Sequence, residues 1–224
     1  MHDAKGHRSC EKASCTVRRY GLVRKLINRG IQNAEVIQAF RVIPRHLFVA
    51  TPFQSQAYDD VPLPIGYDQT ISQPYIVALI CERLLSNSTA RVNVLEIGAG
   101  CGYQTALLSQ LYDRVVSVER IGPFVNTARE RLASLKIENV VLHHADGSEG
   151  IQGDETFCAV VLSAAPLAID SRLLAMLRPE GCLIAPVGPP NNQTLKLIIC
   201  KNGEVREESQ GSVRFVPIVR GTIN

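Results

Sequence analysis

A glycine-rich segment in the middle of the chain contains the residues best suited to binding a small ligand. Residues 94–103 predict a buried strand, a loop and the start of a helix. The loop carries three glycines, which are Gly98, Gly100 and Gly102. Glycines let the backbone approach a ligand closely, but Tyr103 stands where a dinucleotide site requires its last glycine. The acidic Glu96 before the loop also favours a cationic or amino-bearing ligand over a phosphate.

Two further acids follow the next two predicted strands. Glu119 lies 17 residues after Gly102 (119 − 102), a spacing that suits a carboxylate accepting from ribose hydroxyls. Asp146 follows the next strand and is placed to accept from the amine of an adenine. A single strand-end acid is as readily a solvated loop residue or a helix cap. Three at successive strand ends are typical of enzymes that bind S-adenosylmethionine.

Alternating strands and helices must position these residues. Strands are expected at 92–97, 114–119, 140–144, 157–163, 182–187, 195–200 and 212–219, and helices near 103–111 and at 123–135. This alternation predicts an α/β fold with a doubly wound, mostly parallel seven-stranded sheet. Asn202-Gly203 is a strong turn signal, so we expect a hairpin and an antiparallel strand near the end of the sheet.

The N-terminal part of the chain predicts a helical segment preceded by a flexible leader. We expect residues 1–15 to be the leader and residues 16–224 to form a single domain. Two short helices follow the leader, the second capped by Asn33 and ended by Pro44. Residues 52–72 show no periodicity, and a loop of that length is usually functional or disordered.

Composition excludes several classes of protein. The chain has 224 residues, 46% of them hydrophobic, and a net charge of only +3, so we expect no nucleic-acid partner. The absence of an apolar run near the ~18 residues of a membrane span predicts a cytoplasmic protein without membrane contacts. The seven cysteines have no paired or metal-binding spacing, which predicts reduced thiols and no metal site. Cys10 and Cys15 have no evident role.

Several segments between residues 20 and 219 combine into a recognisable pattern, and they are 43–48, 57–60, 62–66, 69–75, 94–105, 117–121, 164–166 and 213–217. The stretch Gln-Thr-Ile-Ser-Gln-Pro-Tyr at 69–75 is the most specific, because other methyltransferases share the glycine loop but lack this stretch. With these segments the chain resembles the bacterial protein-L-isoaspartate O-methyltransferases, a family of class I, Rossmann-like, S-adenosylmethionine-dependent enzymes.

The resemblance implies roles for individual residues. Ser72 is implied as the active-site hydroxyl, assisted by Thr70. The cofactor would be bound by Gln69, Ile71, Glu96, Gly98, Gly100, Gly102, Glu119, Asp146 and Gly147, and the substrate by Ala165, Pro166 and Val213. From its local sequence alone, Ser72 is an N-cap for the helix containing Pro74, and both roles are compatible. Family members mostly act as monomers.

The sequence departs from the family at Ala145, where glycine usually precedes the Asp146-Gly147 pair. If this position requires positive φ, alanine introduces strain on the order of 1 kcal/mol. The contact between Asp146 and adenine would then be in doubt.

The implied reaction moves a methyl group from S-adenosylmethionine to the free α-carboxylate of an L-isoaspartyl residue in damaged proteins and peptides. The ester then closes to a succinimide, which initiates repair. A carboxylate with a pKa near 4 is already ionised, so no general base is required. Two alternatives stay open, namely a methyltransferase for a small molecule or nucleic acid, and a binding module without turnover.

Overall fold

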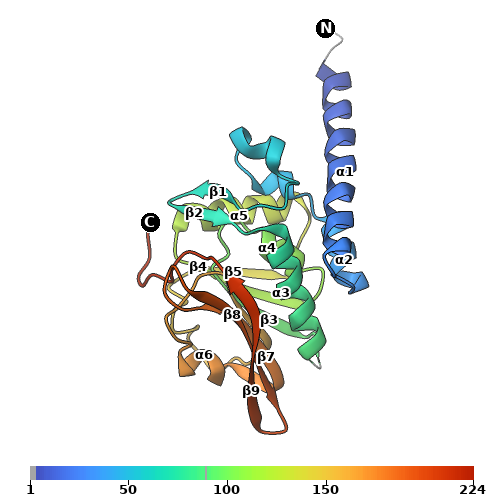
Figure 1. Cartoon of the computed structure of the whole chain (residues 1–224). Coiled ribbons are helices and arrows are strands. Elements are labelled where there is room, and N and C mark those ends of the chain that lie inside the picture. The colour runs from blue at the N-terminus through green and yellow to red at the C-terminus, as the bar shows by residue number, and fades with distance from the viewer. Residues whose placement is uncertain (1–3, 89) are drawn as a thin grey trace.

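The computed structural model describes residues 4–88 and 90–224, with side chains described from residue 14 onward. Its central feature is a seven-stranded sheet in the order β5-β4-β3-β6-β7-β8-β9 (Figure 1). The strands are β3 (Asn93–Ile97), β4 (Arg114–Glu119), β5 (Val140–His144), β6 (Phe157–Leu162), β7 (Leu177–Val187), β8 (Gln193–Lys201) and β9 (Glu204–Val213). The expected doubly wound, mostly parallel sheet is confirmed.

The strand β8 is antiparallel to both of its neighbours, whereas the pairs from β5 to β7 are parallel. Asn202 and Gly203 join β8 to β9 with φ angles of 52° and 78°, as a tight two-residue hairpin requires. The predicted hairpin is thus confirmed, but the predicted strand 212–219 is wrong. The strand β9 ends at Val213, and residue Pro217 beyond it has no N–H for a continuing ladder.

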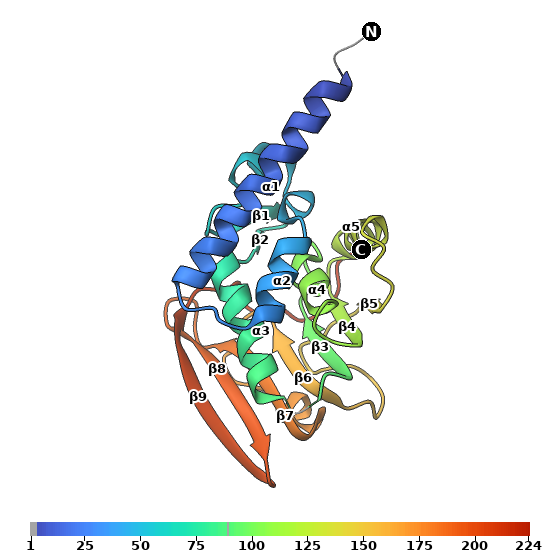
Figure 2. The same cartoon turned by 90° about the vertical axis from the view of Figure 1, so that its right-hand side faces the viewer.

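Helices cover both faces of the sheet. The helices α1 (Ala4–Asn28), α2 (Ala34–Val42), α3 (Pro74–Asn87) and α4 (Tyr103–Leu108) gather over one face (Figure 2), and α6 (Ser171–Ala175) lies across the other (Figure 1). The fully buried neighbours Val94 and Leu95 on β3 belong to different apolar clusters, because successive strand side chains point to opposite faces. The helix α5 (Gly122–Ser134) packs against β4 and β5.

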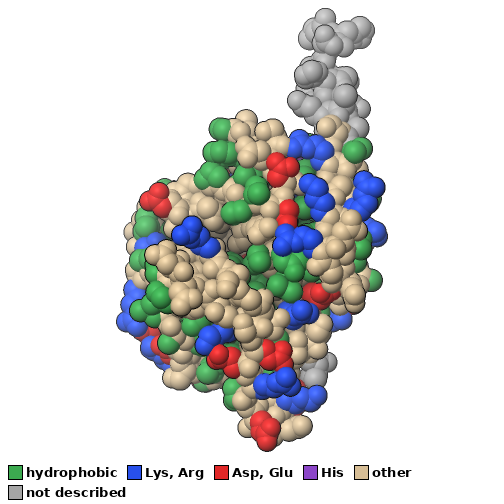
Figure 3. Space-filling view, in the orientation of Figure 1, with side chains coloured by type: hydrophobic (Ala, Val, Ile, Leu, Met, Phe, Trp, Pro, Cys, Tyr) green, Lys and Arg blue, Asp and Glu red, His purple; other side chains and the backbone are tan. Residues whose placement is uncertain are grey.

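The helix α1 begins at Ala4, inside the segment expected to be a flexible leader. Residues 4–15 are helical, and they contain several good helix formers and no proline. Basic side chains gather along the part of α1 whose side chains are described (Figure 3). Cys15 is half-buried and packs against the core, while the side chain of Cys10 lies outside the described residues.

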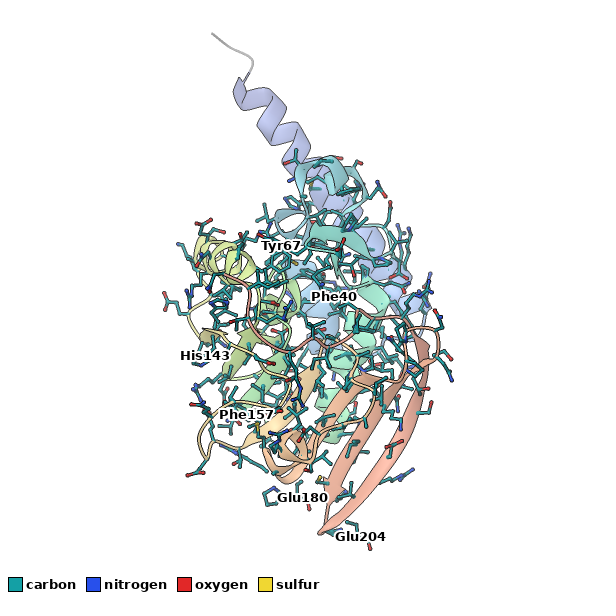
Figure 4. All side chains as sticks on the ribbon, turned by 90° about the vertical axis from the view of Figure 1, so that its left-hand side faces the viewer. Phe40, Tyr67, His143, Phe157, Glu180 and Glu204 are labelled. Carbon is teal, nitrogen blue, oxygen red and sulfur yellow. The ribbon has the colours of Figure 1, made fainter. Side chains whose placement is uncertain are left out.

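The segment expected to be an irregular loop contains regular structure. A short 3-10 helix, η1, spans Arg45–Phe48 just before it, and a second, η2, spans Thr51–Gln56 at its start. The strands β1 (Leu63–Gly66) and β2 (Gln69–Ile71) then form a separate antiparallel pair. Pro64 makes this hairpin hard to predict from the sequence, because proline in a sheet is confined to edge strands, strand starts and bulges. Figure 4 places Tyr67 of this hairpin far from Glu204 at the tip of the β8–β9 hairpin.

Candidate functional site

A cleft with about 900 Å³ of space, including the open solvent at its mouth, lies at the carboxyl ends of the central parallel strands. This is the edge at which a doubly wound sheet binds ligands. We call it the large cleft. Its walls are formed by residues 97–101, 118–121, 145–148, 163–164 and 216–219, together with 65, 69–72 and parts of α3 and α4. Segments far apart in the sequence therefore meet at one place.

The glycine loop forms the floor of the large cleft. Gly98 and Gly100 line it with φ angles of 93° and 52°. A Cβ atom at Gly100 would lie 3.3 Å from Ile65 of the β1–β2 hairpin, so the loop and the hairpin approach closely because the side chain is missing. Gly102 does not line the cleft, contrary to expectation. It begins α4 at a φ of 86°, and a Cβ there would lie 3.0 Å from the Cβ of Ala128.

Glu119 joins the glycine loop to the loop that follows β4. Its side chain is 5% exposed and lines the large cleft. One carboxylate oxygen accepts from the backbone N–H of Gly100 at 2.8 Å, and the other accepts from that of Ile121 at 2.9 Å. A carboxylate offers about four acceptor positions, so two remain for hydroxyl groups of a ligand.

Asp146 also lines the large cleft, just beyond the strand that pairs with β4. Its two oxygens accept from the backbone N–H groups of Ser148 at 2.9 Å and Gly221 at 2.6 Å. Desolvation raises the pKa of Asp146, but these hydrogen bonds outweigh it, so the net pKa is lowered and the carboxylate stays charged. Ala145 is not among the residues with positive φ, so the strain considered for it is absent. At Gly147 a Cβ would lie 2.9 Å from Ile97, which explains the glycine.

Glu96 lies beneath the glycine loop and is fully buried. Its carboxylate accepts from Thr105 at 2.5 Å, Ser117 at 2.6 Å and Gln104 at 3.1 Å. Desolvation raises its pKa to about 7, against the opposing effect of these hydrogen bonds. Glu96, which the sequence places among the cofactor-binding residues, does not line the cleft. It reaches the cleft wall only through Gln104, which also donates to Ser163 at 2.9 Å.

A second cavity, which we call the adjoining groove, opens beside the large cleft. The two cavities share four lining residues, which are Thr70, Ser72, Ser163 and Val216. Gln69 and Ile71 line the large cleft alone, and Val213 lines the groove. Thr70 and Ser72 thus lie where the two cavities meet. Ser163 was not predicted as a site residue, although it follows β6 directly and the strand-end position that identifies Glu119 could have identified it too.

Ser72 does not cap α3. The helix begins at Pro74 and its N-cap residue is Gln73, which makes no capping side-chain hydrogen bond. The N–H of Tyr75 donates instead to Asp60 at 2.8 Å. The interpretation of Ser72 as an N-cap is therefore wrong, and within the described residues its hydroxyl forms no hydrogen bond. Asp60 is a site-forming residue that the sequence alone did not single out.

The C-terminal segment closes one side of the large cleft. Residues 216–219 line it, and Ala165 pairs with this segment through hydrogen bonds to Val216 at 2.8 Å and from Ile218 at 2.9 Å. Ala165 and Pro166 are buried and line neither cavity, so they support the wall rather than form it. Beyond the cleft, Ile223 exchanges hydrogen bonds with residues 120 and 122.

A doubly wound sheet, with a glycine-floored cleft and strand-end carboxylates at its carboxyl edge, defines a class I methyltransferase. The family model for protein-L-isoaspartate(D-aspartate) O-methyltransferase matches residues 17–222. The chain belongs to this family.

Named relatives agree with the family match. The chain is 44% identical over 205 residues to protein-L-isoaspartate O-methyltransferase 1 of Marinobacter nauticus, covering 92% of this chain and 93% of the relative. It is 44% identical over 202 residues to the Alcanivorax borkumensis enzyme of that name, covering 90% and 91%.

Solved structures share the fold. A protein-L-isoaspartate O-methyltransferase matches with a TM-score of 0.80 at 26% identity, covering 92% of this chain and 67% of its own. The Plasmodium falciparum protein, solved with S-adenosyl-L-homocysteine, has a TM-score of 0.78 at 24% identity, covering 89% of this chain and 97% of its own.

We expect Glu119→Ala to weaken S-adenosylmethionine binding by roughly 1 to 3 kcal/mol, because buried N–H donors and ligand hydroxyls would lose their acceptor. Isothermal titration measures this change. Asp113→Ala, which alters an exposed acid at the opposite end of β4, should leave the affinity unchanged. Equal affinities of the Glu119 variant and the wild type would remove Glu119 from the ligand site.

We expect the raised pKa of Glu96 to make stability depend on pH. Between the ordinary value of 4.5 and about 7, the folded chain retains a proton that the unfolded chain releases. The contribution of protonated Glu96 to the free energy of unfolding is therefore complete below pH 4.5 and is lost as the pH rises through 7. Relative to Glu96→Gln, the wild type should lose on the order of 1 to 3 kcal/mol of unfolding free energy from pH 5 to pH 8. Urea denaturation tests this, and parallel pH curves for the two proteins would contradict it.

Proposed function

We propose that this protein transfers a methyl group from S-adenosylmethionine to the free α-carboxylate of L-isoaspartyl residues in damaged proteins and peptides. The family match and the names of the relatives support this reaction. The methyl ester closes to a succinimide without further help from the enzyme, and hydrolysis then returns part of the material to normal aspartate. Repair is therefore partial in each cycle.

The observation that carries the proposal is the junction between the two cavities. The four residues shared by the large cleft and the adjoining groove have no ionisable side chain. An acceptor that needed deprotonation would require a base at this point, whereas a carboxylate is already charged at neutral pH. The hydroxyls of Thr70 and Ser72 can donate to such a carboxylate and orient it without neutralising it.

The described residues fit S-adenosylmethionine in the large cleft. Gly98 and Gly100 provide a floor without side chains, Glu119 retains acceptor positions for the ribose hydroxyls, and Asp146 is charged and placed for the adenine amine. When bound, the cofactor supplies a methyl group on a positively charged sulfur. The contribution of the chain is to align donor and acceptor and to exclude water, which can give effective molarities on the order of 10⁵ M or more.

The adjoining groove suits a peptide substrate. It is lined by Val213 and its neighbours on one side, and by Pro62, Gln73 and Ile76 on the other. Among the described residues its lining contains one charged side chain, that of Arg214, so few side-chain features of the substrate can be selected. A groove of this kind supports binding of the backbone around a damaged site in many different sequences.

We also propose a location and an oligomeric state for the enzyme. We place the enzyme in the cytoplasm as a monomer without nucleic-acid partners, in keeping with its near-balanced charge and its thiols. Within the described residues, no helix is long and apolar enough to cross a membrane. Residues 16–224 are proposed to act as one methyltransferase domain.

Methyl-labelled S-adenosylmethionine and two matched peptides test the proposal. One peptide contains an isoaspartyl residue and the other a normal aspartyl residue at the same position. We expect label in the isoaspartyl peptide alone, released by mild base as methanol because the product is an ester. Label in neither peptide, or in both equally, would overturn the proposed substrate, and cofactor binding without any transfer would favour a binding module.

We expect Ser72→Ala to lower kcat about 10-fold to 100-fold, because a hydrogen bond to a charged group contributes about 1.5 to 3 kcal/mol. The Kd for the cofactor should change little, since the hydroxyl faces the junction. Steady-state kinetics with the isoaspartyl peptide and a separate cofactor titration measure the two quantities. Ser88→Ala alters a half-buried serine at the other end of α3 and serves as the control. An unchanged kcat in the Ser72 variant would exclude a direct role.

A further inference from the structure

Arg45 in η1 is a fully buried guanidinium beside the junction of the two cavities. It forms none of the salt bridges found among the described residues. Its Nη1 donates to the backbone carbonyl of Ser72 at 2.8 Å, and its Nη2 donates to that of Val61 at 3.1 Å. The Cζ atom lies 5.1 Å from the centre of the Tyr103 ring.

Burying this charge is costly. Moving a guanidinium out of water costs several kcal/mol, and carbonyl acceptors offset this less completely than a carboxylate would. Burial accordingly lowers the pKa of Arg45, and its Nε has no hydrogen-bond partner. A Met or Leu side chain would fill a similar volume without this cost. Packing alone therefore does not explain an arginine at this position.

The two carbonyls that Arg45 joins belong to opposite ends of the β1–β2 hairpin. Val61 precedes β1 and Ser72 follows β2, so the planar guanidinium closes the base of the hairpin. Asp60 fixes the residues that follow Ser72, because it accepts from the N–H of Tyr75 and from the side chain of Gln73. The backbone of Ser72 is thus held from both directions.

The direction of the Ser72 carbonyl sets the plane of the peptide that links it to Gln73. Because Ile71 on the other side of Ser72 is held by its pairing with Leu63, the backbone is fixed on both sides and the Cα–Cβ bond of Ser72 has a defined direction. The donors of a guanidinium have a rigid geometry, so one side chain can hold two separate carbonyls. A lysine ammonium at the same position carries the charge but lacks that planar geometry.

We propose that Arg45 is a positioning residue for methyl transfer, which fixes the Ser72 backbone so that its hydroxyl faces the acceptor carboxylate at the junction. This inference rests on the proposed function. Arg45 lines neither cavity and acts only through Ser72. Its loss should therefore affect the alignment of the acceptor and leave the cofactor contacts of Gly98, Gly100 and Glu119 intact.

The test compares Arg45→Lys and Arg45→Ala with wild type, using the isoaspartyl peptide as substrate. We expect kcat to fall about 10-fold to 100-fold in Arg45→Lys, because a misplacement near 1 Å can cost about 100-fold in rate. The Kd for S-adenosylmethionine should stay within about 2-fold, a change of only ~0.4 kcal/mol. Millimolar guanidinium chloride should restore part of kcat in Arg45→Ala, since the free ion can occupy the vacated site.

Arg178→Lys is the matched control. Arg178 also donates to a backbone carbonyl, that of Thr156 at 3.1 Å, but it lies outside both cavities. Its variant should retain the wild-type kcat even if its Tm falls.

Three outcomes would overturn the inference. The first is an unchanged kcat in Arg45→Lys, and the second is a parallel loss of kcat, cofactor affinity and Tm, as a purely structural residue would give. The third is a folded Arg45→Ala variant that guanidinium does not restore. If Arg45→Ala fails to fold, the kcat and Kd of Arg45→Lys decide alone. A wild-type enzyme that does not methylate the isoaspartyl peptide would instead refute the proposed function.

Discussion

The site depends on one carboxylate that is held by backbone N–H groups from two different loops. Glu119 ends β4 and accepts from Gly100 on one side and from Ile121 on the other. Because parallel strands end at a common edge, this acid can join two consecutive connections of the sheet. Gly100 reaches it with a backbone conformation that side chains disfavour, so the glycine loop and the acid have to occur together. The shape of the cleft floor follows from this pair.

Two buried charged groups support the site in different ways. Glu96 is neutral or charged according to pH and is surrounded by three side-chain donors, so its burial is well compensated in both states. Arg45 is compensated by two main-chain carbonyls and by the ring of Tyr103, without a salt bridge among the described residues. Glu96 supports the glycine loop, and Arg45 supports the β1–β2 hairpin that covers this loop. Both sides of the cleft thus rest on polar groups that do not touch the ligand space.

The sequence predicts the sheet and the two outer acids well, because strand ends are visible as β-branched runs followed by acidic residues. It predicts the buried positions less well. β3 is buried on both faces, so hydrophobic alternation cannot show that Glu96 lies outside the lining of the cleft. Likewise, a glycine pattern does not separate Gly100, which faces the cleft, from Gly102, which packs against Ala128. The β1–β2 hairpin and the capping of α3 by Asp60 depend on contacts between segments that local sequence patterns do not encode.

The way the last residues cross the carboxyl edge has a practical consequence. Gly221 donates to Asp146, which lines the cleft, and Ile223 pairs with the start of α5, so the final residues are anchored beside the ligand space. A purification tag or fluorescent protein fused after Asn224 would emerge at the mouth of this cavity and compete with entering molecules. Fusions intended for binding or kinetic work are better attached ahead of α1, which extends away from that edge (Figure 1).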